Sequence, residues 1–340
     1  MSAAKTPTLA DVADRAGVSP KTASRVLNHE GNVRPDKVAR VLAAATELGF
    51  TPNEFARLLR TRGSTTTIGV VTADIGDPFW TGVIRGVELA IGDPDRDDVG
   101  HPQRFILSAS TRERSDREPE IVAAMVDRRV MALLVVPTTT DQSYLGALAE
   151  RGVPVVCVDR PAAGTDVDAV VADDDGGARR GVELLIAQGH RRIAFVGRPS
   201  VYTTAERIAG YRAALRAAGI VVDDRLVHPT ITDAASVGPI AERLLSLDDP
   251  PTAVFTADVA ASIGMLACRR TRSWRPAMVA FSDFDAAPVV EPTVTVVHND
   301  PVELGRRAAE LVLDRLAGYT GPPRRVRIDT PIIERESHLA

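Results

Sequence analysis

From Thr67 onward, short apolar runs alternate with longer amphipathic stretches, and this alternation restricts the possible folds more than any other feature. The runs are rich in valine, isoleucine and leucine and lie at 68–71, 104–107, 132–136, 153–158, 192–196, 253–255 and 277–281. The amphipathic stretches fall at 79–92, 117–129, 141–151, 176–189, 203–218, 235–247, 258–270 and 301–317. Strands that are buried on both faces and joined by crossover helices form parallel sheets. Because about 270 residues of this pattern exceed one core, we expect a body of two α/β lobes.

Residues 8–28 have the spacing of two short helices joined by a tight turn. Apolar residues recur at i, i+3, i+4 and i+7 from Leu9 to Ala16, which gives the first helix one narrow apolar stripe. Gly17 permits the positive φ of a sharp turn. The Ser-Pro pair at 19–20 then supplies an N-cap and a proline at the first position of a second helix.

The outer face of this second helix is polar near its start. Lys21, Thr22 and Arg25 stay outside when Ala23 and Val26 turn inward. A recognition helix places residues of this kind in the major groove of DNA, so the pattern predicts a DNA-reading helix pair. An ordinary helical hairpin with a solvated polar face is the alternative.

The charge of the N-terminal segment favours DNA binding. A third helix is predicted from Pro35 to the glycine at position 49, and Thr8 with Asp11 predicts a capping box on the first helix. Residues 1–62 carry ten lysines and arginines against six acidic residues, whereas the whole chain has a formal net charge of −4. The basic N-terminal segment is therefore suited to phosphates, and the acidic remainder is not.

Composition narrows the class of protein further. A content of 44% hydrophobic and 25% charged residues is typical of soluble globular proteins. No apolar run reaches the roughly 18 residues of a membrane-spanning helix, and the N-terminus lacks a signal-peptide core, so we expect a cytoplasmic protein. Cys157 and Cys268 lie far apart in apolar runs, which predicts buried thiols rather than a disulfide or a metal site.

Ligands of open parallel sheets bind beyond the carboxyl ends of the strands, where loops of two lobes can face one cleft. The candidate loops are 72–80, 137–139, 159–160, 197–198, 256–258 and 282–284. Phe79 and Trp80 are adjacent aromatic residues in a chain with 4% aromatics, and they form either a stacking surface for a ring or sugar or part of the core. Arg207 begins a helix after another strand, where it either binds a ligand or forms a helical ion pair.

The order of these parts resembles the lactose and galactose repressor (LacI/GalR) family of transcriptional regulators over essentially the full length. The stretches that carry the resemblance include 17–19, 24–28, 48–53, 57–61, 67–71, 189–197, 207–215, 251–255 and 303–311. The resemblance implies a helix-turn-helix headpiece at 1–50, a hinge helix and linker at 51–64, and a body at 65–340 similar to periplasmic sugar-binding proteins. Within the body it implies an N-lobe of about 65–161 and 294–320 and a C-lobe of about 162–291 and 323–340.

The resemblance also implies which residues contact DNA. They are Thr8, Ser19, Pro20, Lys21, Thr22, Ser24, Arg25, Asn28, Asn53, Ala56 and Leu59. Proline at position 20 departs from the polar or aromatic residue often found there, so base readout depends on Lys21 and Arg25. Leu59 has the place of the leucine wedge that opens a base step in the minor groove, although 53–62 could also be a plain linker.

The effector contacts implied by the resemblance come from the loops after the strands of both lobes. They are Asp77, Phe79, Trp80, Asp159, Arg160, Tyr202, Arg207, Asp258 and Ser282. Asp258 and Val259 stand where family members commonly have Asn-Asp, and Ser282 replaces the first aspartate of a Gly-Phe-Asp-Asp pattern. Two acceptors typical of sugar binders are missing or moved, which disfavours a standard hexose, and we expect a small polar ligand held by Arg207.

These features together predict a sequence-specific repressor whose operator affinity is controlled by a small polar ligand, a sugar or related metabolite. We expect a homodimer on a pseudo-palindromic operator, with neither a metal nor a cofactor. An enzyme is the first rival, but no phosphate loop, nucleophile elbow or metal-ligand cluster is found. A transport-type binding protein is the second, and the basic N-terminal segment argues against it.

Overall fold

The structure of the chain, a computed structural model, describes residues 7–27, 33–48, 50, 66–92, 104–199 and 202–339. It consists of two compact units, Met1–Thr65 and Thr66–Ala340, here called the head and the body. Each unit has its own hydrophobic core and is described by itself.

The head contains three helices around a small apolar core. They are α1 (Leu9–Ala16), α2 (Pro20–Leu27) and α3 (Pro35–Leu48). The expected capping box is present, because the Thr8 backbone N–H donates to Asp11 Oδ2 (2.7 Å) and the Asp11 N–H donates to Thr8 Oγ1 (3.3 Å). Gly17 ends α1 with a φ of 62°, which glycine adopts without strain. The prediction of a helix pair with a third supporting helix is confirmed.

The N-lobe of the body is a fully parallel sheet of six strands in the order β11-β5-β4-β3-β1-β2. Its strands are β1 (Thr67–Thr72), β2 (Phe105–Ser110), β3 (Ala132–Val135), β4 (Val155–Val158), β5 (Asp168–Ala172) and β11 (Arg325–Ile328). Helices α5 (Pro78–Ile91) and α12 (Pro301–Leu316) pack on one face. Helices α6 (Arg117–Asp127) and α7 (Ser143–Glu150) pack on the other face.

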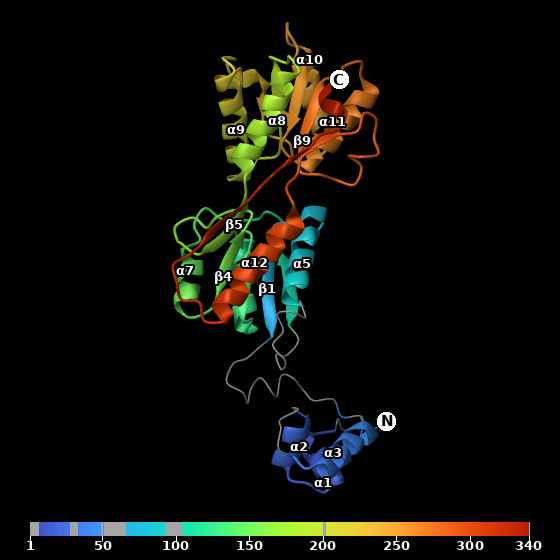
Figure 1. Cartoon of the computed structure of the whole chain (residues 1–340), viewed down its shortest axis with the longest axis vertical. Helices are drawn as coiled ribbons and strands as arrows, with labels where there is room; N and C mark the ends of the chain where they lie inside the picture. The colour runs from blue at the N-terminus through green and yellow to red at the C-terminus, as the bar shows by residue number, and fades with distance from the viewer. Residues whose placement is uncertain are drawn as a thin grey trace. The chain divides into compact units, whose positions relative to one another are not determined.

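The C-lobe contains the second six-stranded sheet, in the order β12-β10-β9-β8-β6-β7. Its strands are β6 (Ile193–Val196), β7 (Val227–His228), β8 (Ala253–Thr256), β9 (Ala277–Phe281), β10 (Thr295–Val297) and β12 (Ile332–Ile333), of which β12 is antiparallel to β10. Helices α8 (Asp174–Ala187) and α9 (Thr203–Ala217) cover one face. Helices α10 (Val237–Leu245) and α11 (Val259–Thr271) cover the other. The predicted two-lobe α/β body is therefore confirmed, and Figure 1 shows the two lobes joined by chain segments that cross between them.

The crossing points differ from the expected lobe boundaries. Strand β5 was expected in the C-lobe but pairs with β4 of the N-lobe, so the first crossing is at Asp173. Strand β10 was expected in the N-lobe but pairs with β9, which puts the second crossing at 298–300. Strand β11 was expected in the C-lobe but pairs with β5, and the third crossing follows at 329–331. These strands are short, and an apolar run does not say which distant strand it pairs with.

Helices α5 and α12 are packed so closely that their backbones touch. A side chain at Gly86 would place its Cβ 2.0 Å from the Val302 carbonyl oxygen, and one at Gly305 would lie 1.9 Å from that of Val83. Only glycine permits this approach, so the two helices form one firmly packed pair.

Two further expectations concern cysteine and membranes. Cys157 and Cys268 are free and buried, as predicted. Among the described residues, no helix has both the length and the apolar content that crossing a bilayer would require.

Candidate DNA-reading helix and ligand cleft

The exposed side of α2 carries most of the residues expected to contact DNA. Ser19, Pro20 and Lys21 are exposed at its start, whereas Thr22 and Arg25 are half-buried. The Ser19 hydroxyl accepts a hydrogen bond from the Thr22 N–H (3.2 Å) and so caps the helix. Thr8, which is also exposed, caps α1, and Ser24 lies half-buried on α2. Of the other expected DNA contacts, Asn28, Asn53, Ala56 and Leu59 lie outside the described residues.

A cavity of about 570 Å³ lies in the body at the carboxyl ends of the strands of both lobes. This volume falls within the roughly 300–1,000 Å³ of small-molecule sites. Eight of the nine expected effector residues line it, namely Asp77, Phe79, Trp80, Asp159, Arg160, Arg207, Asp258 and Ser282. The structure thus brings residues together that are up to 205 positions apart in the sequence, and their contact with a ligand remains a prediction.

Tyr202 is the expected effector residue that does not line this cavity. Its hydroxyl accepts a hydrogen bond from Arg325 Nη2 (2.6 Å), and the Arg325 guanidinium lies 5.9 Å from its ring. Tyr202 belongs to the C-lobe and Arg325 to β11 of the N-lobe, so this contact joins the lobes outside the cavity.

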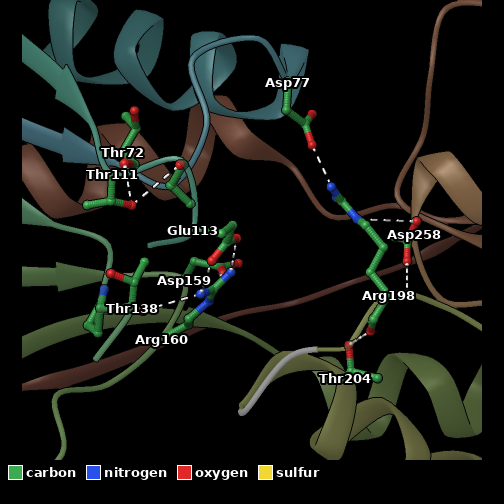
Figure 2. A network of polar contacts seen from close by, with 12 residues as sticks. Thr72, Asp77, Thr111, Glu113, Thr138, Asp159, Arg160, Arg198, Thr204 and Asp258 are labelled. Carbon is green, nitrogen blue, oxygen red and sulfur yellow. Dashed lines mark hydrogen bonds and ion pairs between the residues drawn. The ribbon is translucent and has the colours of Figure 1, made fainter. Parts of the chain in front are cut away.

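Arg160 organises the N-lobe wall of the cavity, on the left of Figure 2. Its guanidinium donates to both carboxylate oxygens of Glu113, at 2.8 and 3.0 Å, and its Nε donates to Asp159 at 3.3 Å. Its Nη1 also donates to the Pro137 carbonyl oxygen at the end of β3 (3.3 Å). Burial raises the pKa of the Asp159 carboxyl above its usual range, against the lowering effect of Arg160. Arg160, Glu113 and Asp159 therefore form one ion cluster in the N-lobe wall.

Arg198 forms a second cluster, on the right of Figure 2. Its Nη2 donates to Asp77 of the N-lobe (3.3 Å), and its Nε lies 3.6 Å from Asp258 of the C-lobe. Asp77 also caps α5 by accepting from the Phe79 N–H (3.0 Å), and Asp258 caps α11 by accepting from the Ala261 N–H (2.9 Å). Arg198 was not among the expected effector residues, although the loop at 197–198 was a candidate cleft loop.

Arg207 lies on the floor of the cavity with 7% of its surface exposed. Its Nε donates to Asp174 of α8 (2.7 Å), its Nη1 donates to the Ala257 carbonyl oxygen (2.6 Å), and its guanidinium lies 3.9 Å from the Phe281 ring centroid. The Arg207–Asp174 ion pair thus joins α9 to α8, whereas the alternative expected from the sequence was an ion pair within one helix. These bonds use Nε and one N–H of Nη1, so the second N–H of Nη1 and the two of Nη2 are the donors that a ligand could meet.

Asp174 is the buried partner of Arg207. Burial raises the pKa of its carboxyl to about 6, although the Arg207 charge acts in the opposite direction. Its second oxygen, Oδ2, is buried and has no hydrogen-bond partner among the described residues. A carboxylate with one unsatisfied oxygen in an apolar environment costs free energy when it is ionised.

The two aromatic residues of the cleft have different surroundings. Their rings meet edge to face with centroids 4.9 Å apart. Trp80 is 5% exposed and belongs to the N-lobe core, whereas Phe79 is half-buried and packs against that core. Trp80 is therefore part of the core, and a stacking role for the more accessible Phe79 remains a prediction.

Backbone strain is concentrated at the cavity. Five non-glycine residues of the described chain have positive φ, and four of them line the cavity: Arg112, Glu113, Asp159 and Ser282. Such conformations cost about 1–3 kcal/mol each and persist where the surrounding structure enforces them, typically at functional sites.

Asn299 is a lining residue that the sequence reasoning missed. It follows β10 in the second crossing, is 2% exposed, and neither its Oδ1 nor its Nδ2 has a hydrogen-bond partner among the described residues. A buried amide without partners indicates a place for a polar ligand or water. Its place two residues after the short, mostly apolar run at 294–297 was the signal that could have found it.

Two protein families match parts of this chain. Residues 8–53 match the family described as bacterial regulatory proteins, lacI family, and residues 182–338 match the periplasmic binding protein-like domain. The first range contains the head helices, and the second contains most of the C-lobe with α12 and β11.

Similarity to individual proteins extends over nearly the whole chain. The HTH-type transcriptional regulator CelR of Thermobifida fusca is 34% identical, with 97% of this chain and 98% of CelR covered. A solved transcriptional regulator CelR-cellobiose complex covers 97% of this chain and 99% of that chain, with a TM-score of 0.70 and 30% identity. The Lac repressor dimer bound to operator and the anti-inducer ONPF has a TM-score of 0.85 at 23% identity, covers 99% of this chain and 100% of that chain, and shares the fold.

Proposed function

The chain belongs to the lacI family of bacterial regulatory proteins, and from this premise we propose that it is a repressor whose operator affinity is set by a neutral polyhydroxy ligand in the cleft of the body. Helix α2 reads bases from the major groove, and a homodimer supplies the two half-sites of a pseudo-palindromic operator. We place this DNA-binding activity in the cytoplasm.

Three of the four arginines that line the cavity are held in ion pairs, and this pairing carries the proposal of a neutral ligand; the fourth, Arg112, is exposed. Arg160 is held by Glu113 and Asp159, Arg198 by Asp77 and Asp258, and Arg207 by Asp174, which lies behind the lining. An anionic ligand at any of these three paired arginines would have to displace a carboxylate and leave it in a partly buried site without its cation. That costs free energy, whereas hydroxyl groups can join an existing ion pair as both donors and acceptors.

The remaining lining supports a sugar or a similar compound. Phe79 offers an apolar face, and the unpartnered amide of Asn299 offers one acceptor and two donors. Sugars combine apolar C–H faces with hydroxyl edges, so both features match them. The cellobiose of the CelR complex belongs to this chemical class, and we propose a neutral mono- or disaccharide for this cleft.

We propose that the cleft binds its ligand without transforming it. Of the seven carboxylates that line it, those at 113 and 159 are engaged by Arg160, those at 77 and 258 cap helices and face Arg198, and that at 283 pairs with Arg335. A general acid or base must be able to exchange a proton with the substrate, and groups fixed in ion pairs and caps are poorly suited to that task.

A thermal-shift panel tests this proposal. The purified full chain is heated with neutral mono- and disaccharides and, in parallel, with the matching sugar phosphates, sugar acids and nucleosides. A ligand at about 100 times its Kd adds about 2.7 kcal/mol to the free energy of unfolding of the folded body and raises its melting temperature by several degrees. We expect the shift from neutral sugars. A shift from anionic compounds alone, or from none of the panel, contradicts the proposal.

A matched pair of variants locates the binding site. Asn299→Ala should reduce the shift, because the amide faces the cavity. Arg212 lies on α9, away from the cavity lining, and forms an exposed ion pair with Asp224. Arg212→Ala removes this pair and should keep the thermal shift of the parent.

A further inference from the structure

We propose that Arg198 is a latch that holds the two lobes together across the mouth of the cleft when no ligand is bound. The proposal concerns the regulation of the site described above and rests on the proposed function of that site. It starts from the position of one guanidinium between carboxylates of different lobes, Asp77 at the start of α5 and Asp258 at the start of α11.

The backbone of Arg198 is fixed on both sides. Its N–H donates to Asp258 Oδ2 (2.7 Å), and its carbonyl oxygen accepts from the Thr204 hydroxyl (2.9 Å). Both partners belong to the C-lobe, so the residue is anchored there and its side chain extends to the N-lobe, as Figure 2 shows. The backbone of Arg198 is therefore fixed in the C-lobe, and its side chain reaches the N-lobe from this anchored position.

The cation suppresses a repulsion between the lobes. Without Arg198, the carboxylates of Asp77 and Asp258 would face each other across the cleft with like charge. The helix N-termini that both residues cap reduce this repulsion only in part. Loss of the guanidinium thus removes an attraction and exposes a repulsion, and both changes favour separation of the lobes.

The latch is weak enough to be released. The Arg198 side chain is 40% exposed and that of Asp77 is 21% exposed, so water screens the pair. Ion pairs of this kind shift an equilibrium by a few-fold rather than by orders of magnitude. A neutral ligand that enters between Asp77 and Arg198 can bond to both through its hydroxyl groups, which lengthens the direct contact while each charge keeps a polar partner.

The N-lobe end of the latch is connected to a firmly packed part of the lobe. Asp77 caps α5, and α5 touches the backbone of α12 at Gly86 and Gly305. Helix α12 follows the second crossing segment, 298–300, which also contains the cavity residue Asn299. A displacement at Asp77 is therefore passed to the helix pair that adjoins the crossing.

Four substitutions separate the latch from a structural role. Arg198→Ala removes the cation, and Asp77→Asn removes the charge on the other side while its side-chain oxygen can still cap α5. Arg198→Lys keeps the charge without the planar fork and should have an intermediate effect. The matched control is Arg212→Ala, because Arg212 is 41% exposed and pairs with Asp224 inside the C-lobe.

The test measures the separation of the lobes in the ligand-free full chain. Spin labels are attached to Ala149→Cys in α7 and Ala217→Cys in α9, two exposed positions in different lobes, and the native cysteines are buried and do not compete. Labelled protein is diluted with unlabelled protein so that a dimer holds one labelled chain. Double electron–electron resonance then gives the distance distribution between the labels.

We expect Arg198→Ala and Asp77→Asn to increase the population of longer distances about two- to fivefold and Arg212→Ala to leave it unchanged. If both latch variants have the distribution of the parent, the latch is refuted, whether or not any sugar binds. If they keep that distribution but bind a sugar more weakly, Arg198 is a ligand contact, and the latch is refuted as well. The thermal-shift panel fails or succeeds separately from this measurement.

Discussion

The DNA-reading helix and the ligand cleft carry charge in opposite ways. On α2, Lys21 is exposed at the start of a short helix that packs on a small core. In the cleft, Arg207 and Asp174 are almost withdrawn from water, and Arg160, Arg198 and Arg207 are held by carboxylates. An exposed cation can adjust to a phosphate or a base, and it costs little to keep. A buried ion pair is costly to build, but it presents a ligand with groups that are already fixed in place.

The largest effect is expected where the cleft depends on a buried ion pair. Arg207→Ala leaves the Asp174 carboxyl buried without its cation, and breaking such a pair costs about 3–5 kcal/mol. Denaturant unfolding of the body should show this loss together with the loss of ligand binding. The exposed counterpart, Arg212→Ala, should cost at most about 1 kcal/mol. Equal losses in the two variants would show that burial does not distinguish these pairs.

The buried Asp174 carboxyl should make the stability of the body depend on pH. Burial raises the pKa of this carboxyl from 3.8 to about 6 in the folded body. A group whose pKa is raised by folding binds its proton more tightly in the folded state, so its contribution is fully present below about pH 4 and is lost as the pH rises through 6. The change amounts to about 3 kcal/mol.

The free energy of unfolding of the parent, measured between pH 4 and 7, should therefore fall relative to that of Asp174→Asn. If the difference between the two proteins is the same at every pH, the Asp174 carboxyl does not change its proton occupancy in this range.

A smaller effect is expected on the DNA-reading helix α2 of the head. Arg25→Ala should weaken binding to the operator by about 1–3 kcal/mol and relax the base preference at one position of each half-site. Arg34→Ala, which removes an exposed ion pair with Asp36 at the start of α3, is the control. Equal losses of affinity for operator and random DNA in Arg25→Ala would reduce Arg25 to a phosphate contact.

The smallest effect is expected from Asn299→Ala. Its amide has no partner in the fold, so removing it should leave the free energy of unfolding of the ligand-free body nearly unchanged. Ligand affinity, measured by calorimetry, should fall by about 0.5–1.5 kcal/mol for each hydrogen bond lost. A variant that is markedly less stable without ligand would show that Asn299 has a structural role instead.

The three described helices of the head could be predicted from the sequence because their signals are local. The stripe from Leu9 to Ala16, the Thr8–Asp11 capping box and the turn at Gly17 each involve residues within a few positions of one another. Propensity and capping act over that same range, so the helices α1, α2 and α3 begin and end close to where they were expected.

The body could be predicted in its class but not in its connections. Its apolar runs indicated parallel sheets, yet the lobes that contain β5, β10 and β11 depend on partners that are distant in the sequence. The site followed the same rule. The places of Asp159, just after a clear strand, and of Arg207, near the start of a helix, in the cavity lining were predicted. Asn299, in contrast, follows a strand of three residues, and Arg198 acquires its role only through Asp77 of the other lobe.

The coupling between these two regions is tested most directly by operator affinity with and without ligand. An operator is selected from a random DNA library, and its Kd for the full chain is measured by fluorescence anisotropy at fixed salt. With a saturating sugar from the thermal-shift panel, we expect the Kd to change by about five- to 150-fold. Without sugar, the Asn299→Ala variant should bind the operator with the Kd of the parent. It should need a higher sugar concentration to reach the same change in Kd. A sugar that binds the cleft tightly but leaves the operator Kd unaltered would contradict control of DNA binding by this site.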